Sequence, residues 1–334
     1  LAQALAKKGK TTAAISAARW GWVSFNMDAD LEQEFREAFG ADLATMHEAR
    51  LDMLLWQGAI SSAKRMLSSV SSDQVKLAKA RLALQENKNG VTAFLAKVPD
   101  SLKTDPGLAF DRFKWRLVRK KADGAIKLLL EKSATAVSLG RPEKWAEQRL
   151  SLARDLLWDG KYQKAYDVAA SHHLDASEDY AELEWLAGFI ALRKLKNPKP
   201  ALAHFKNHEA AVGSEISLGR THYWQGRTLH AMAQSEQAQR AYTKGAKYQT
   251  SFYGLLAADA AGLPMQRSLA GNVVDPGWRQ AAFVESSVFK AALLLISIDR
   301  SRFGVRFLTH LAESQSPTGM AQLGGMAEEL GIPY

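Results

Sequence analysis

Residues 178–193 read EDYAELEWLAGFIALR, and their spacing predicts a helix that is buried on two sides. Five residues repeat at helical intervals and share one face: Leu183, Leu186, Ala187, Ile190 and Ala191. A second apolar face carries Trp185, Phe189 and Leu192. A helix that is apolar on two sides packs between neighbouring helices, so we expect this segment to lie inside a stack of helices.

The same helical spacing continues along most of the chain. Helices of three to five turns are predicted over residues 145–158, 161–172, 198–211, 216–232, 235–248, 250–262, 287–298, 301–313 and 319–330. Asp105 and Pro106 are expected to open a further helix, with Asp105 as its N-cap. Strand patterns bounded by turn residues are missing, and residues 266–276 are interpreted as a loop. The predicted fold class is therefore all-α.

Small and aromatic residues recur in a pattern typical of tetratricopeptide-like helix pairs. After YWQGR at residues 223–227, Gly226 is followed by Ala238 and Tyr242. The same order of glycine, alanine and aromatic residue recurs at Gly188, Ala201 and Phe205, with a spacing that differs by one residue. We expect the glycine to allow close approach of the partner helix and the aromatic ring to close the space. The pattern predicts a right-handed superhelix of antiparallel helix pairs over residues 1–265, with further helices over 266–334 as a linker-type region.

Composition and charge fit a helical array. The chain has 334 residues, of which 47% are apolar, so it can bury a core. A single core stops growing near about 250–300 residues, whereas an array escapes this limit because each repeat packs only on its neighbours. There is no cysteine, which excludes disulfides, thiolate nucleophiles and Cys-ligated zinc. The net charge of +9 favours anionic partners such as nucleic acid, anionic lipid or a carboxylate-bearing cell wall.

No targeting or membrane segment is predicted. Residues 1–10 contain no apolar stretch behind a basic start, so no signal peptide is expected, as in a mature secreted chain. The longest apolar run, near residues 291–298, is too short to cross a bilayer.

Two histidines have a spacing that is compatible with a metal site. His204 and His208 stand four residues apart, a spacing that can bind a metal, but Phe205 replaces the glutamate of the zinc-protease pattern. We therefore interpret this helix face as solvated, and we expect His172 and His173 to support exposed carbonyls at a helix end. Phosphate-binding loops and a G-x-S-x-G elbow are missing. No catalytic residue, metal or cofactor is expected.

Glu285, which is followed by Ser286 and Ser287, resembles the start of the motif that carries the catalytic glutamate in lysozyme-like enzymes. Such a glutamate needs an apolar pocket that raises its pKa. Here a plain buried-helix pattern follows, VFKAALLL at residues 288–295, without a glycine-rich turn. We interpret Glu285 as part of a helix N-terminus, where a carboxylate suits the helix dipole.

The densest basic stretch lies in residues 112–121. Arg112, Arg116 and Lys120 are spaced at i, i+4 and i+8 and would form a stripe on one helix. They are the candidate contacts with a polyanion such as peptidoglycan. The alternative, which we favour, is a solvated outer face whose aromatic residues Phe110, Phe113 and Trp115 pack inward.

Several segments together resemble one protein family, the soluble lytic murein transglycosylases. Residues 180–193 resemble the family helix "AEAEWLAGWIALR", residues 223–227 resemble "YWxGR", and residues 250–264 resemble "TFYGQLAA…LGLP". At the glutamine of the last pattern this chain has Leu255. The match runs from about residue 80 to the end and includes segments near residues 105–115, 141–145, 309–313 and 326–331.

The resemblance implies a cellular location and separate roles for two domains. In the family, a ring-like or horseshoe-shaped helical array lies in the periplasm and carries a C-terminal lysozyme-like domain. That domain cleaves the β-1,4 bond between N-acetylmuramic acid and N-acetylglucosamine, with one glutamate as acid and then base and without a metal. This sequence is expected to stop short of that domain, so no catalytic residue is carried over. The implied partners are peptidoglycan strands, the chain's own catalytic domain and other cell-wall proteins.

Two other functions remain as alternatives. A free-standing tetratricopeptide-like scaffold would bind peptide segments and need no enzyme. Nucleic-acid binding through the stretch 112–121 would show a steep loss of affinity with salt. We rank it last because no base-stacking aromatic module accompanies the charges, and we expect neither a nucleic-acid partner nor a membrane span.

Overall fold

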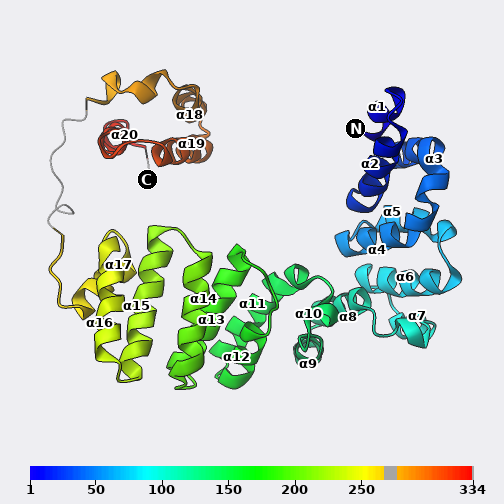
Figure 1. Ribbon diagram of the computed structural model, residues 1–334, viewed down its shortest axis with the longest axis horizontal. Helices are drawn as coiled ribbons and strands as arrows, with labels where there is room; N and C mark the ends of the chain where they lie inside the picture. The colour runs from blue at the N-terminus through cyan, green and yellow to red at the C-terminus, as the bar shows by residue number, and fades with distance from the viewer. Residues whose placement is uncertain (267–276, 333–334) are drawn as a thin grey trace. The chain divides into compact units, whose positions relative to one another are not determined.

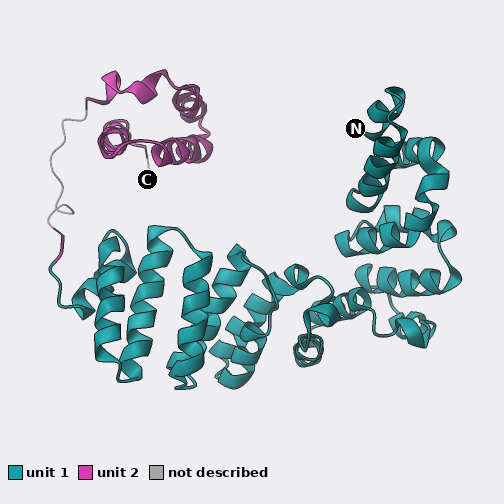
Figure 2. Cartoon of the chain, viewed as in Figure 1, with its two compact units in different colours: residues 1–264 teal, residues 265–334 magenta. Residues whose placement is uncertain are grey.

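A computed structural model describes residues 1–266 and 277–332 of the chain. The described residues divide into two compact units, Leu1–Pro264 and Met265–Tyr334 (Figure 2). Within them every regular element is a helix, which confirms the all-α fold class, and no β-strand is present in these two ranges. Residues 267–276, which belong to the loop expected from the sequence, lie outside the described residues.

The first part of unit 1 consists of short helices around two apolar clusters. The helices are α1 (Ala2–Lys7), α2 (Thr11–Ser24), α3 (Ala29–Leu43), α4 (His47–Gln57), α5 (Ile60–Arg65), α6 (Ser72–Gln85) and α7 (Val91–Ala96). Trp22, Leu43 and Leu54 are among the fully buried side chains of the first cluster. Leu77, Leu84 and other residues of α6 lead into the second cluster, toward α7.

Three helices connect this part to the middle of the chain: α8 (Pro106–Val118), α9 (Ala122–Lys132) and α10 (Ala136–Leu139). Asp105 caps α8 as predicted, because its carboxylate accepts a hydrogen bond of 2.6 Å from the backbone N–H of Leu108. Pro106 occupies the first turn, where its missing N–H costs little. Helix α8 contacts α4, α6, α9 and α10, so it stands at the centre of this region.

Between residues 142 and 260 the helices form three consecutive pairs followed by one further helix (Figure 1). They are α11 (Pro142–Trp158), α12 (Tyr162–Ala170), α13 (Glu178–Arg193), α14 (Pro198–Ala211), α15 (Glu215–Ala231), α16 (Ser235–Gly245) and α17 (Phe252–Ala260). Each helix contacts the next one along the chain, and α11, α13, α15 and α17 also contact one another in turn. A helix that is apolar on two sides, such as residues 178–193, packs against neighbours on both of them, which explains this order of contacts.

The glycines of the repeat pattern lie where helices meet most closely. A Cβ atom added at Gly188 would lie 2.8 Å from Cε1 of Phe205. One added at Gly226 would lie 2.8 Å from Cζ of Tyr242 and closer still to two other ring carbons. Both aromatic rings are buried. The predicted role of the glycine, close approach of the partner helix, is confirmed in the pairs α13–α14 and α15–α16. The expectation that Tyr242 closes the space between pairs is wrong, because its ring packs on Gly226 within its own pair.

Unit 2 contains its own small core. Its helices are α18 (Ser287–Ser297), α19 (Ser301–Glu313) and α20 (Pro317–Glu329), preceded by 3₁₀ turns at Trp278–Gln280 and Ala282–Glu285. Phe289, Leu311 and Met326 are buried in this core, one from each helix. Among the residues that the structure describes in either unit, no helix combines the length and the hydrophobicity needed to cross a bilayer.

Candidate polyanion-binding site

Arg112 and Arg116 project from one face of α8 into a hollow of about 460 Å³ beside α9. We call it the basic hollow. Its lining consists of Lys103, Thr104, Ala109, Arg112, Arg116, Lys121, Gly124, Lys127, Leu128, Glu131 and Lys132. Every ionisable side chain of this lining except Glu131 is a cation. A concave surface with so unbalanced a charge attracts anions.

Arg116 is the most constrained cation of the basic hollow. Its Nη1 donates a hydrogen bond of 2.9 Å to the carbonyl oxygen of Gly124, at the start of α9. Burial lowers the pKa of Arg116, and the nearby charge of Arg112 lowers it further. The guanidinium remains charged at neutral pH because arginine starts from a very high pKa. Two like charges therefore lie side by side, and an anion between them would relieve their repulsion.

Lys120 does not belong to this face, and the predicted three-residue stripe is wrong at that position. Helix α8 ends at Val118, and Lys120 follows in a left-handed conformation with φ of 55°. A stripe at i, i+4 and i+8 needs a continuous helix, so Lys120 leaves the face of Arg112 and Arg116. Lys121, Lys127 and Lys132 take its place, because α9 turns back against α8.

The aromatic residues of α8 lie as the favoured alternative predicted. Phe110 and Phe113 are buried, and both contact the ring of Trp145 in α11. Trp115 is half-buried, and the ammonium of Lys121 lies 5.5 Å from its ring. The arginines of α8 thus face the basic hollow, whereas Phe110 and Phe113 pack toward the core and Trp115 stays half-exposed.

A second hollow, of about 610 Å³, lies on the opposite side of α8, and we call it the aromatic hollow. Its apolar lining includes Trp56, Phe110, Trp115 and Val118. Its polar lining mixes amides, carboxylates and ammonium groups, among them Gln85, Glu143, Lys144, Glu147 and Asp179. Unlike the basic hollow, it carries both signs of charge, with carboxylates (Asp111, Glu143, Glu147 and Asp179) outnumbering ammonium groups (Lys114 and Lys144).

The interpretation of His204 and His208 as a solvated face is wrong, because His208 is fully buried and the side chain of His204 is only 14% exposed. His204 Nδ1 lies 2.6 Å from Oε2 of Glu184 in α13. His172 Nε2 lies 3.2 Å from the other oxygen, Oε1, and its Nδ1 accepts a hydrogen bond from the backbone of Leu174. The proton of His172 is therefore on Nε2, and it points at the carboxylate. His172 supports Glu184 and not an exposed carbonyl, whereas His173 binds the carbonyl of Ser133, as expected.

These contacts fix the charge of Glu184. Burial alone would raise the pKa of the carboxyl group, but hydrogen bonds with His172 and His204 outweigh burial and lower it to about 2. Asn207 adds a third donor, at 3.3 Å. The group ties α13 to α14 and to the turn before α13. The described residues hold no cluster of three or more side chains suited to a metal.

His208 is fully buried and uncharged. Burial lowers its pKa to about 4, and the charge of Arg220 contributes. Arg220 Nη2 donates to His208 Nε2 at 3.2 Å, so the ring proton must lie on Nδ1, which donates to the hydroxyl of Thr221. This chain of hydrogen bonds links α14 to α15.

Glu285 lies in an environment opposite to that of a general acid. Its side chain is exposed and forms an ion pair of 2.7 Å with Lys290. The hydrogen bond from Lys290 lowers the pKa of Glu285, whereas a catalytic acid at neutral pH needs a raised one. Glu285 precedes α18, and the hydroxyl of Ser286 caps that helix instead.

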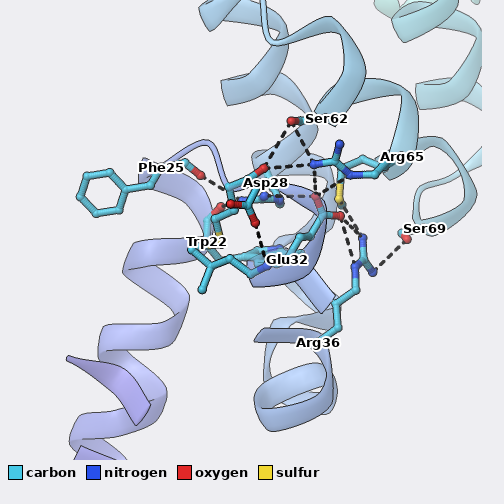
Figure 3. A network of polar contacts seen from close by, with 12 residues as sticks. Trp22, Phe25, Asp28, Glu32, Arg36, Ser62, Arg65 and Ser69 are labelled. Carbon is cyan, nitrogen blue, oxygen red and sulfur yellow. Dashed lines mark hydrogen bonds and ion pairs between the residues drawn. The ribbon is translucent and has the colours of Figure 1, made fainter. Parts of the chain in front are cut away.

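A second polar cluster surrounds Glu32 of α3 (Figure 3). Its carboxylate lies 3.1 Å from Arg36, 3.0 Å from Arg65 and 3.5 Å from Arg50. Arg50 is fully buried and also donates to the carbonyls of Trp22 and Phe25. Because all three guanidiniums share a single carboxylate, the cluster holds α2, α3, α4 and α5 together.

Comparison of the chain with models of known protein families, with curated protein sequences and with solved structures gives no match.

Proposed function

We propose that this chain is the non-catalytic helical arm of a periplasmic lytic transglycosylase. The arm would bind or position peptidoglycan while a separate lysozyme-like domain cleaves the bond between N-acetylmuramic acid and N-acetylglucosamine. The observation that carries the proposal is the basic hollow, because the carboxylates of peptidoglycan give it a matching charge. The resemblance of residues 178–264 to that family supplies the rest.

The proposed architecture is a right-handed superhelix of tetratricopeptide-like helix pairs, curved into a ring or horseshoe as in the family. The contacts among α11, α13, α15 and α17 support it, since stacked pairs touch through their first helices. The close approaches of Gly188 to Phe205 and of Gly226 to Tyr242 also support it, because they lie in the segments that carry the resemblance. Such an array presents a surface and leaves bond cleavage to another domain.

The experiment is sedimentation of the purified chain with isolated peptidoglycan sacculi. We expect the chain to sediment with the sacculi, and we expect no 1,6-anhydro-muropeptides to be released into the supernatant. Failure to sediment would contradict the binding role. Release of anhydro-muropeptides would show that the chain is itself catalytic, and Glu285→Gln would then test whether that glutamate is the acid.

A free-standing peptide-binding scaffold is the second candidate, and the aromatic hollow favours it. Trp56, Phe110 and Trp115 offer apolar contacts, while Gln85 and Glu147 offer hydrogen bonds, which suits a short peptide segment. The coding sequence beyond residue 334 discriminates between the two functions. A glutamate–serine pair followed by a G-x-x-Q segment there favours the enzyme arm, and a stop codon favours the scaffold.

A further inference from the structure

Most cations of the basic hollow have no carboxylate in ion-pair contact within the described ranges. Among the described residues, Lys103 is the one lining cation with such a contact, to Asp100 at 2.6 Å. In the same ranges Arg112, Lys127 and Lys132 have no carboxylate partner. Several unpaired cations thus line one concave place, where an incoming anion meets them at once.

The cations stand on two facing walls. Arg112 and Arg116 are one helical turn apart on α8, and Lys127 and Lys132 come from α9 across the hollow. Arg116 is already oriented by its hydrogen bond to the carbonyl of Gly124. A ligand that enters between the walls can therefore pair separate negative groups with separate cations. This arrangement suits a short chain with several carboxylates better than a single charge.

The uncharged part of the lining distinguishes between kinds of polyanion. It consists of Thr104, Ala109, Gly124 and Leu128, and the lining contains no aromatic side chain. Proteins that bind single-stranded nucleic acid stack its bases on aromatic side chains. The basic hollow offers charge and small groups instead, so its lining favours carboxylates carried on a slender backbone over nucleobases.

We propose that the basic hollow binds short acidic peptides through their carboxylates. If the proposed function holds, on which this second step rests, the natural occupant is the peptide stem of peptidoglycan and not its glycan chain. The hollow then fixes the position of the arm along a strand by its stems. The sugars remain accessible to the separate catalytic domain.

The first test uses a soluble probe that is independent of peptidoglycan. Isothermal titration measures binding of N-acetylated triglutamate to the full chain and to the double variant Arg112→Glu/Lys127→Glu. The matched control, Lys79→Glu/Lys206→Glu, makes the same charge change on exposed lysines outside the hollow. We expect the hollow variant to lose at least about tenfold in affinity and the control to change by less than about twofold. Circular dichroism checks that both variants are folded, and equal affinities of wild type and hollow variant would overturn the proposal.

The second test separates the peptide stem from the glycan. Sedimentation compares intact sacculi with sacculi whose stems an amidase has removed. We expect binding to intact sacculi alone, and equal binding to both would overturn the stem assignment while leaving the arm function standing. If the chain binds triglutamate but neither preparation, the acidic-peptide site is supported and the proposed function fails. Tighter binding of a single-stranded oligonucleotide than of triglutamate at equal salt would assign the hollow to nucleic acid and overturn the proposal.

Discussion

Gly226 of α15 lies directly against the ring of Tyr242 in α16, and a side chain at position 226 has no room. An added Cβ would lie 2.8 Å from Cζ of the ring, well inside van der Waals contact. Tyr242 cannot swing away, because it is buried and also contacts the ring of Tyr223. The distance between the two helices of this pair is therefore set by a missing side chain.

Gly226→Ala is expected to destabilise unit 1 even though alanine favours a helix. The intrinsic gain of alanine over glycine inside a helix is about 1 kcal/mol. Overpacking of a buried contact costs about 1–3 kcal/mol or more, and here the neighbour is a rigid ring. The difference is a net decrease in the free energy of unfolding of up to about 2 kcal/mol, measured by urea denaturation.

Gly40→Ala in α3 is the matched control. Gly40 is also helical, but an added Cβ there would meet nothing within 4 Å. This variant should keep the propensity gain and leave the protein unchanged or slightly more stable. If both substitutions stabilise the protein alike, the contact with Tyr242 does not set the helix spacing. Tyr242→Leu in the Gly226→Ala background should recover part of the loss.

The glycine–ring contacts could be predicted from the sequence, whereas the polar network could not. Gly226 and Tyr242 occur in a fixed order within a helical period, so their meeting needs only two helices and a turn. Glu184 and His204 are polar residues on separate helices, and nothing in their spacing indicates that a third helix would cover them. The spacing of His204 and His208 shows a shared face but not its burial.

The basic hollow was foreseen in part for a similar reason. Arg112 and Arg116 share a face within one helix, which helical periodicity predicts. Lys120 looked like their continuation, because no glycine or proline marks the end of α8 before it. The helix stops there because the chain turns back into α9, and the same turn brings Lys127 and Lys132 to the site. Tertiary contacts of this kind leave no local signal in the sequence.

Glu184→Gln should weaken the middle of unit 1 at neutral pH. The pKa of Glu184 is lowered to about 2 in the folded chain, from 4.5, so the folded state favours the charged carboxylate. The stabilisation is present above pH 4.5 and is lost as the pH falls toward 2. We expect a loss of about 2–3 kcal/mol at pH 7 that shrinks progressively below pH 4.5. Urea denaturation across this range measures it, with the exposed Glu178→Gln of the same helix as control, and a loss that stays constant with pH would contradict the assignment.

His208→Gln should change stability in a higher pH window. The folded chain holds His208 neutral, with its pKa lowered from 6.5 to about 4, whereas the unfolded chain protonates it below 6.5. The free energy of unfolding of the wild type therefore falls as the pH decreases between these values, by up to about 1.4 kcal/mol per pH unit for one proton. The variant should lack that contribution. His230→Gln, at an exposed position of α15, should retain the wild-type slope. Identical slopes in all three proteins would show that folding does not lower the pKa of His208.

Glu32→Gln should be among the most damaging single substitutions in the first part of the chain. Arg50 is fully buried, and burial lowers its pKa. The negative charge of Glu32 opposes this effect and stabilises the charged guanidinium. Arg50 and Arg36 also lie over the ring of Trp22, at 4.0 Å and 5.1 Å, and removal of the carboxylate leaves these cations crowded around an aromatic core. Loss of one partner of a buried ion cluster costs about 3–5 kcal/mol, and we expect a loss of this size in urea denaturation.

Glu34→Gln, an exposed neighbour in α3, should cost less than about 0.5 kcal/mol. Because Arg36 and Arg65 remain solvent-accessible, high salt should reduce the loss only in part, and complete rescue by salt would show that the cluster acts as a surface ion pair.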